Sequence, residues 1–384
     1  MSIIQVNQIV NSIVGQALGK SDIVGTDTSF VSLGDEILSS DKNTEAVYGV
    51  MIDRIGRTVS SIRAYRGRKA NLRRNPMEWG VVLQKLSMPL SEAVENPSWL
   101  GVDDTSDGNV LAPANKQKPT QKLFNKVSTW EYDATIWNKQ LRTAFTSPEA
   151  MMAFIDMIFT AVYNSQEASF ENLDSLCRAN FIAQIKENGE ARAINLLDLY
   201  NTQTKKALTV ANCLHDSDFL IFCAMTISLY SQRMETIGRT FNDGTIDRHT
   251  PHDLQNMTVL ADFSKAMDYA AKSKTYHDNI VTMPMYTEVP FWQGSGKRTS
   301  PGLWTFENTS HIIVENYNSG SAEAHEVNGV VALLADYEAM GTTIQNMSTS
   351  SMYNPRRKFT NYFMQADLGY YNDLSENGII FYIE

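Results

Sequence analysis

The stretch that most resembles a site for chemistry is Gly294-Ser295-Gly296-Lys297, which looks like the end of a phosphate-binding loop. In such a loop, backbone N–H groups and a Lys hold the phosphates, and the motif also needs a Gly five residues before the Gly-Lys pair and a Ser or Thr after the Lys. Phe291 and Arg298 stand at those two positions. We therefore interpret the stretch as a turn and expect no nucleotide cofactor.

Two histidines have a spacing that metal sites use. His249 and His252 are flanked by acidic residues, and on a helix they would share one face. Thr250-Pro251 between them predicts a loop instead, because Pro does not continue a helix. The sequence offers no further cluster of Cys or His to complete a ligand set. We expect surface histidines at the start of a helix and no bound metal.

Enzyme signatures with fixed spacing are missing from the sequence. It has no nucleophile elbow, no HExxH zinc motif and no Rossmann glycine pattern. The cysteines match no metal spacing, and we expect reduced thiols that behave as small apolar residues: Cys177, Cys213 and Cys223. We expect no catalytic residue, although an enzyme whose carboxylates meet only in the folded chain stays an alternative.

Charged residues are distributed unevenly in the first third of the chain. Residues 54–74 carry eight basic side chains and no acidic one, and the irregular stretch 91–119 begins with acidic residues. A solvated basic face and a phosphate contact both fit the basic run. The two sets can also form ion pairs between neighbouring chains. Under this last interpretation, the candidate inter-subunit contacts are Arg63, Arg66, Arg68, Lys69, Arg73, Arg74, Glu92, Glu95, Asp103, Asp104 and Asp107.

The longest uninterrupted helical pattern runs from residue 148 to residue 188. Ser147 is a good N-cap, Pro148 occupies the helical position where a missing N–H costs nothing, and Asn188-Gly189 is a C-terminal stop. These 41 residues would form a helix about 60 Å long. The alternative is a helix broken near Asn164-Ser165. We expect a buried stripe, and an i,i+4 pair of Asp174 and Arg178 on the wet side; the stripe comprises Phe170, Leu173, Leu176, Cys177, Phe181, Ile182 and Ile185.

Two other segments are amphipathic but too small to fold alone. Residues 3–18 carry a helical apolar stripe that ends at Gly19, and residues 78–86 and 121–136 predict a two-stranded arm around the irregular stretch 91–119. An isolated hairpin is marginal in water. Both segments therefore need a partner surface, in their own domain or in a neighbouring chain. In the returning strand, Trp130, Tyr132, Ala134 and Ile136 alternate with Thr129, Glu131, Asp133 and Thr135.

The remainder of the chain mixes helices and strands. Helical patterns cover residues 218–238 and 253–272. Strand-forming residues gather at 311–317, 329–334, 359–368 and 378–384. Because helices and strands are segregated rather than alternating, we predict the fold class α+β.

Composition limits the class of protein further. The chain has 384 residues, of which 43% are hydrophobic and 20% charged, as is typical of a globular protein. Its 33 basic and 43 acidic residues give a net charge of -10, whereas proteins that bind nucleic acid through its phosphates usually carry a basic excess. No apolar run approaches the ~20 residues that cross a bilayer, and no basic residue precedes Lys20. We expect neither membrane insertion nor a secretory signal.

The C-terminal run from Phe359 to Phe381 and the stretches at 289–296, 121–147 and 5–10 form a recognisable combination. In these stretches, and over nearly its whole length, the sequence resembles the major capsid proteins of tailed bacteriophages. The resemblance implies the Hong Kong 97-like phage capsid fold, with an N-terminal arm, an extended loop, a long spine helix, and peripheral and axial domains. For this chain it implies an arm at 1–60, the extended loop and its base at 61–136, a peripheral domain at 137–200 with the spine helix at 148–188, an axial domain at 201–345, and a return to the peripheral domain at 346–384.

The resemblance also implies a function. The chain would be the subunit that self-assembles, as pentamers and hexamers, into the icosahedral head shell of a tailed double-stranded DNA phage in the cytoplasm of the bacterial host. Its implied partners are copies of itself, a portal protein and a scaffolding protein, and it would enclose DNA without sequence-specific binding. An encapsulin-like compartment of the same fold is the alternative shell, and an enzyme is the alternative of another class.

Overall fold

The structure is a computed structural model that describes residues 72–74, 83–91, 118–124, 127–138, 148–188, 190–274, 286–293, 306–314 and 324–384. The predicted N-terminal helix and the tip of the predicted arm lie outside these residues. The chain divides into two compact units. Unit 1 contains residues 127–175 and 342–370 together with residues 72–74, and unit 2 contains residues 176–341 and 371–384 together with the described parts of 80–126.

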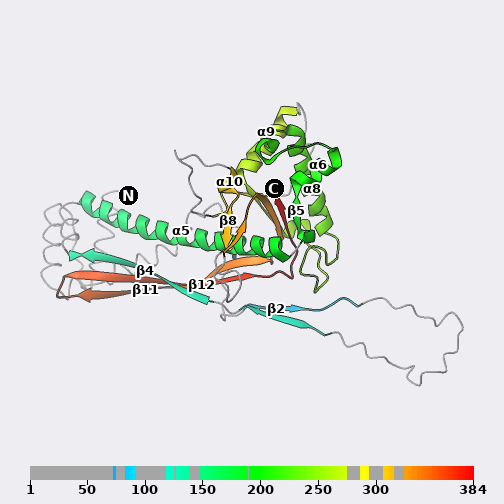
Figure 1. The fold of residues 1–384 in the computed structure, drawn as a ribbon. Helices are drawn as coiled ribbons and strands as arrows, with labels where there is room; N and C mark the ends of the chain where they lie inside the picture. The colour runs from blue at the N-terminus through cyan, green and yellow to red at the C-terminus, as the bar shows by residue number, and fades with distance from the viewer. Residues whose placement is uncertain are drawn as a thin grey trace, which may run out of the picture. The chain divides into compact units, whose positions relative to one another are not determined.

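A single helix, α5, runs from Pro148 to Asn188, which are the predicted bounds (Figure 1). The alternative of a break near Asn164-Ser165 is wrong, because the helix continues through both residues. In the predicted stripe Leu176 is 50% exposed and is therefore misassigned. The confirmed members, all buried, are Phe170, Leu173, Cys177, Phe181, Ile182 and Ile185.

The prediction that Asp174 and Arg178 lie on the wet side of α5 is also wrong. Both residues are buried. A buried carboxylate needs hydrogen-bond donors, and Asp174 has one from outside the helix, since Thr342 Oγ1 donates to Asp174 Oδ1 over 2.6 Å. The buried face of α5 is therefore wider than its apolar residues indicate.

Unit 1 contains a four-stranded sheet with the strand order β1-β11-β12-β4. β12 pairs antiparallel with β4, in a register that runs from Phe359 opposite Trp137 to Gly369 opposite Val127. The predicted alternation along β4 is confirmed: the even-numbered side chains from 130 to 136 are half-buried or buried, and the odd-numbered ones are exposed. The strands are β1 (Arg73–Arg74), β4 (Val127–Trp137), β11 (Met340–Asn354) and β12 (Phe359–Asn372).

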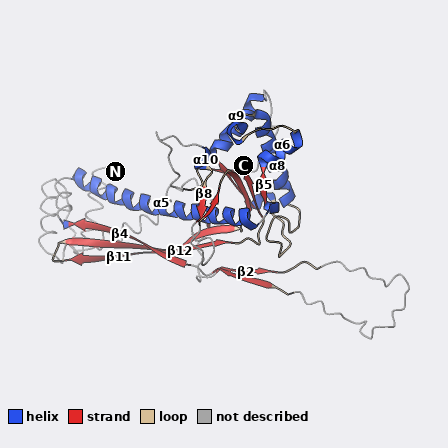
Figure 2. Cartoon of the chain, viewed as in Figure 1, coloured by secondary structure: helices blue, strands red, loops and turns tan. Residues whose placement is uncertain are grey.

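The two faces of this sheet differ in chemistry. The outer face carries polar cross-strand pairs, such as Thr129 with Asp367 at 2.7 Å and Thr135 with Asn361 at 2.8 Å. The first part of α5 lies along the sheet (Figure 2). The apolar core of this unit includes Ile136, Val162, Phe170, Leu173, Tyr362, Met364, Ala366 and Leu368, all buried.

Unit 2 is built on a five-stranded mixed sheet with the strand order β5-β13-β10-β6-β7. All seven residues of β10 are buried, as expected for a central strand. The rings of Tyr230 and Phe381 lie 5.8 Å apart, which places helix α8 on one face of β13. Phe181 of α5 contacts the other face at Gly378, where an added Cβ would lie 2.7 Å from the ring. The strands are β5 (Ala193–Asn195), β6 (Gln255–Leu260), β7 (Tyr286–Val289), β10 (Val330–Asp336) and β13 (Gly378–Tyr382).

The remaining elements of unit 2 follow the predictions in part. The helix predicted at 218–238 is confirmed as α8 as far as Met234, the strand predicted at 311–317 is confirmed in its described part as β8, and the strand predicted at 329–334 is confirmed as β10. The helix predicted at 253–272 is wrong in its first part, because residues 255–260 form β6. The further elements are β2 (Leu83–Ser87), β3 (Thr120–Phe124), η3 (Glu190–Arg192), α6 (Leu196–Thr204), α7 (Val210–Cys213), α8 (Ser217–Met234), η4 (His252–Leu254), α9 (Ala261–Lys274), α10 (Phe306–Thr309), β8 (Ile312–Val314) and β9 (His325–Val327).

The cysteines behave as the sequence predicts. Cys177, Cys213 and Cys223 are buried thiols. Burial raises the pKa of Cys213 and raises that of Cys223 well above its ordinary value. Among the described helices, none is long and apolar enough to cross a membrane.

Candidate assembly surface

The hairpin of β2 and β3 carries the most unusual surface of unit 2. Its strands pair antiparallel, with Lys85 directly opposite Lys122, and Leu86 opposite Gln121. Residues directly opposite one another lie on the same face of a hairpin, and successive residues point to opposite faces. One face therefore carries both lysines, and the other carries Leu86 and Leu123.

The lysine face is fixed to the body of unit 2 by a buried carboxylate. Lys85 Nζ lies 3.3 Å from Asp373 Oδ2, and Lys122 Nζ lies 3.1 Å from Asp373 Oδ1. Like charges directly opposite one another on two strands are destabilising. Asp373 is buried and bridges the two lysines, so it turns an unfavourable cross-strand pair into an anchor for the hairpin.

Further polar contacts extend this anchor. Lys85 Nζ also lies 3.2 Å from Glu376 Oε1 and donates to the carbonyl oxygen of Glu338 over 2.8 Å. Arg248 links both sides, since it lies 3.1 Å from Glu376 Oε1 and donates to Ser87 Oγ over 2.8 Å. We call Lys85, Lys122, Arg248, Asp373 and Glu376 the arm anchor.

The charges of the arm anchor shift the pKa values of its members. Burial is the largest single influence on Lys85 and lowers its pKa, but the charges of Glu376 and Asp373 and the hydrogen bonds to them together outweigh burial and raise the pKa overall. For Asp373, burial is opposed by hydrogen bonds from Ser375 and by the charge of Lys85, which together hold the pKa below its ordinary value. Burial dominates for Glu376 and raises its pKa. Asp373 is thus the carboxylate that the site holds most firmly in its charged form.

The opposite face of the hairpin is apolar and exposed. Leu86 is 68% exposed and Leu123 is 57% exposed, and Met88 and Leu90 continue the same alternation beyond the end of β2 with more than half of their surface exposed. The hairpin is therefore inverted: it turns its charged face inward to the arm anchor and its apolar face outward. Such a surface has no use in acid–base chemistry, and it is suited to contact with another apolar surface.

The residues that the sequence proposed for inter-subunit ion pairs lie mostly outside the described part of the chain. Arg73 is the informative exception, because it forms a bidentate pair with Glu167 at 2.8 and 3.1 Å and lies 3.6 Å from Asp174. Arg73 is thus paired within its own chain, and Arg74 is half-buried beside it in β1. The residues outside the described ranges are Arg63, Arg66, Arg68, Lys69, Glu92, Glu95, Asp103, Asp104 and Asp107.

Of the two motifs that resemble sites for chemistry, the structure describes only the histidine pair. Residues 294–297 lie outside the described ranges, while His249 and His252 are both exposed. Within the described residues, no group of His, Cys, Asp and Glu is arranged to hold a metal ion. Sequence reasoning missed the arm anchor. The signal it had was the alternation of Leu86, Met88 and Leu90 with small or polar residues, which predicts an apolar face but not its exposure.

Comparisons with known proteins give the family. A family model described as Phi29-like phage major capsid protein matches residues 6–382. A chain of the capsid structure of Staphylococcus phage Andhra is similar to this one, with a TM-score of 0.51 and 9% identity, over 82% of this chain and 83% of that chain. A chain of the structure of the head fiber and inner core protein gp22 of native bacteriophage P68 gives a TM-score of 0.55 and 8% identity, over the same shares. No curated protein sequence matches.

These findings carry different weight. At identities this low the solved structures show a shared mixed fold of helices and strands and nothing finer. The family match spans almost the whole chain, and a capsid family implies a structural protein of the virion rather than an enzyme. An encapsulin-like compartment is not favoured either. The chain therefore belongs to the Phi29-like phage major capsid protein family and is a subunit of a phage head shell.

Proposed function

We propose that the chain adopts the Hong Kong 97-like capsid arrangement, with the arm at 1–60, the extended loop at 61–136, the peripheral domain at 137–200, the axial domain at 201–345 and the return at 346–384. The support is the single helix α5, of 41 residues, which fits a spine helix, and the hairpin of β2 and β3, which fits the base of an extended loop. One refinement is needed. β13 pairs with β10, so we group this last strand with the axial strands.

The proposed contact between subunits uses the outward apolar face of the hairpin. The observation that carries this proposal is the inversion described above, in which Leu86, Met88, Leu90 and Leu123 are exposed while the lysines face inward. Fully burying one such side chain is worth about 1.5–3 kcal/mol. Each is already partly covered, so burying the rest of all four would contribute about 4 kcal/mol per contact. A shell repeats that contact at every subunit.

The charge of the chain fits a container for DNA. With a net charge of -10, a shell of many copies repels phosphates and would let DNA enter and leave without tight binding. We propose that the shell is the icosahedral head of a tailed double-stranded DNA phage, assembled from pentamers and hexamers in the host cytoplasm with portal and scaffolding proteins as partners. Assembly needs no catalytic residue, cofactor or metal in this proposal.

The proposed ion pairs between subunits now rest on fewer residues. Because Arg73 is engaged by Glu167 of its own chain, we base this contact on Arg63, Arg66, Arg68, Lys69 and Arg74 toward the acidic residues of 92–107. One exposed pair is worth at most about 1 kcal/mol, so only several pairs acting together would affect assembly.

The experiment that tests the arm contact compares two double variants on the same face of the hairpin. Leu86→Gln/Leu123→Gln removes apolar surface, and Gln84→Ser/Gln121→Ser is the matched control at neighbouring exposed positions. We expect at least a tenfold loss of closed shells for the leucine variant, measured by gradient sedimentation and negative-stain microscopy, with unchanged folding of the subunit. Shells at the parent level in the leucine variant would contradict the proposed contact.

A further inference from the structure

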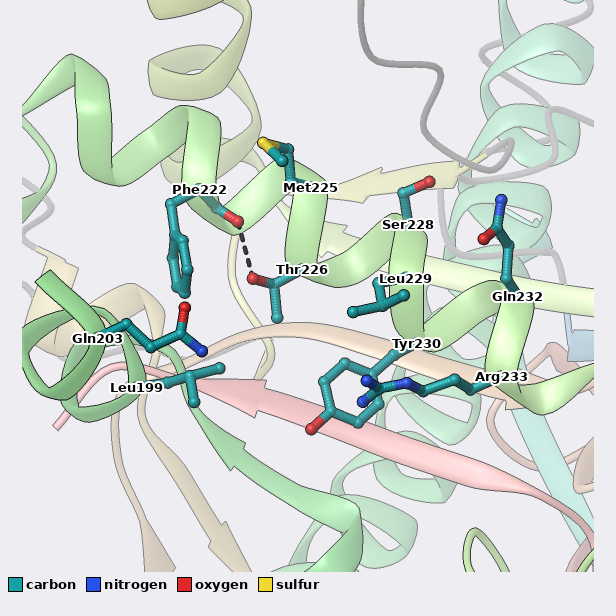
Figure 3. A pocket seen from close by; sticks show the side chains of 10 residues that line it. All are labelled: Leu199, Gln203, Phe222, Met225, Thr226, Ser228, Leu229, Tyr230, Gln232 and Arg233. Carbon is teal, nitrogen blue, oxygen red and sulfur yellow. Dashed lines mark hydrogen bonds between the residues drawn. The ribbon is translucent and has the colours of Figure 1, made fainter.

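A second surface of unit 2 has an unusual composition. Helix α8 lies beside α6, and the two are held together by the ring of Tyr200, which lies 5.3 Å from Phe219 and 5.2 Å from Phe222. Between the outer faces of these helices is an open groove of about 670 Å³, lined by Leu199 and Gln203 of α6 and by residues of α8 (Figure 3). We call it the α6–α8 groove.

The surface of α8 at this groove carries no acidic residue and a single basic one, Arg233. From Phe219 to Gln232 the helix has no Asp, Glu, Lys or Arg, although 20% of the whole chain is charged. A helix on the surface of a protein normally turns charged and polar residues outward. Here Met225 and Leu229, one turn apart, are 58% and 45% exposed. The outer face of α8 thus has the composition of a buried surface while it lies open.

The charged residue among those that line the groove is already engaged. The guanidinium of Arg233 lies 5.1 Å from the centre of the Tyr230 ring, a distance that allows a cation–π contact. The groove therefore offers apolar, amide and hydroxyl groups and one guanidinium to a partner, and no carboxylate, since its lining contains no Asp or Glu.

We propose that the α6–α8 groove is a contact surface for a second copy of this chain in the shell. Every copy carries a net charge of -10, so a second copy is repelled least by a surface that presents no carboxylate, and the groove has none. Because Arg233 is the single ion in its lining, the contact also requires little stripping of water from ions. A basic partner protein would be held by acidic side chains, which the groove does not offer. The contact is head-to-tail, the groove of one subunit receiving a different surface of the next, as in a closed ring.

This inference rests on the shell function that the family gives and is independent of the proposed arm contact. Its first test is Met225→Glu/Leu229→Glu, which introduces two negative charges at exposed positions, beside the neutral variant Met225→Gln/Leu229→Gln. A second control, Ser348→Glu/Ser350→Glu, adds the same charge at exposed positions of β11. Parent and variants are expressed in bacteria under conditions in which the parent forms shells. We expect at least a tenfold loss of shells for the glutamate variant in α8, a smaller loss for the glutamine variant, and none for the control in β11.

Two outcomes of this test overturn the inference. One is a folded α8 glutamate variant that forms shells as the parent does. The other is an equal loss in the β11 control, which would make added charge at any place the cause. If the α8 variants lose shells while Leu86→Gln/Leu123→Gln assembles normally, only the arm contact is refuted. The two proposals can therefore be distinguished.

A measurement on the unaltered protein avoids any variant that fails to fold. Hydroxyl-radical oxidation of Met225 is compared between unassembled subunits and purified shells free of other proteins, with added free methionine as the dose standard. We expect oxidation of Met225 to be at least fivefold slower in shells. Equal rates would overturn the inference, and so would protection that appears only when another protein is bound.

Discussion

Replacing Asp373 by Asn tests the arm anchor directly. The substitution preserves the volume of the side chain and the acceptor for the backbone N–H of Ser375, which donates to Asp373 Oδ1 over 3.1 Å. It removes the negative charge that lies 3.3 Å from Lys85 Nζ and 3.1 Å from Lys122 Nζ. Two lysines then stand directly opposite one another without the carboxylate that bridges them.

The expected loss follows from the burial of each partner. Removing one member of a buried ion pair costs about 3–5 kcal/mol. Lys85 is 12% exposed and keeps Glu376 at 3.2 Å, while Lys122 is 41% exposed and keeps Asp243 at 3.6 Å, so the remaining carboxylates and solvent reduce the cost of removing the charge of Asp373. We therefore expect Asp373→Asn to lower the free energy of unfolding by about 2–3 kcal/mol, which is less than the buried limit. At about 2–4 °C per kcal/mol for a unit of this size, Tm would fall by about 5–10 °C.

The assay is a double-mutant cycle on the unassembled subunit, with urea unfolding followed by circular dichroism. Lys85→Met, Asp373→Asn and the double variant are compared with the parent. The double variant removes both charges of this pair. Its loss in free energy of unfolding should therefore be smaller than the sum of the two single losses by about 1–2 kcal/mol. Additivity within about 0.5 kcal/mol, or a loss below about 0.5 kcal/mol for Asp373→Asn, would refute the anchor as described.

Three further predictions concern pH, packing and charge. The free energy of unfolding of the parent should exceed that of Asp373→Asn by a constant amount from about pH 5 to pH 9. This difference should shrink below about pH 4, as the lowered pKa of Asp373 is crossed, and above about pH 10.5, as Lys85 loses its proton. A difference that stays the same in urea titrations at all these pH values would contradict this. Gly378→Ala should cost about 1–3 kcal/mol in thermal unfolding, because its Cβ would lie 2.7 Å from the Phe181 ring. Gly238→Ala, with no atom within 4 Å of its Cβ, should be nearly silent. Equal effects of the two substitutions would refute the packing argument. Glu92→Lys/Glu95→Lys/Asp103→Lys should block shell formation in gradient sedimentation while the subunit stays folded, and intact shells would leave the two charged sets as independent solvated faces.

The sequence predicts well those elements whose signal is local. α5 has its predicted bounds because Pro148 and Asn188-Gly189 mark helix ends in any context. The strand alternation of β4 survives because one face of its sheet is buried and the other is wet. By contrast, β6 was predicted as helix, since only Met257, Val259 and Leu260 of its six residues are apolar and α9 follows it without a turn. β11 was not predicted at all, because its Ser- and Thr-rich sequence lacks an apolar alternation.

The candidate surfaces depend on contacts that no local pattern encodes. Lys85 and Asp373 are 288 positions apart, and nothing near either residue in the sequence indicates the other. Burial of Asp174 and exposure of Leu176 reverse the usual preference of these residue types, since the neighbours of α5 decide which face is covered. The uncharged run from Phe219 to Gln232 was visible in the sequence, but only its exposure in the structure makes it a candidate contact.

Electron microscopy of the purified chain tests the central claim, that this protein is the subunit of a head shell, most directly. The chain is expressed in bacteria alone and with its candidate scaffolding protein, and the particles are separated by sedimentation and imaged in negative stain. We expect closed shells of uniform diameter whose walls contain this chain as the main protein. Folded subunits that remain monomers or small oligomers under both conditions would contradict it.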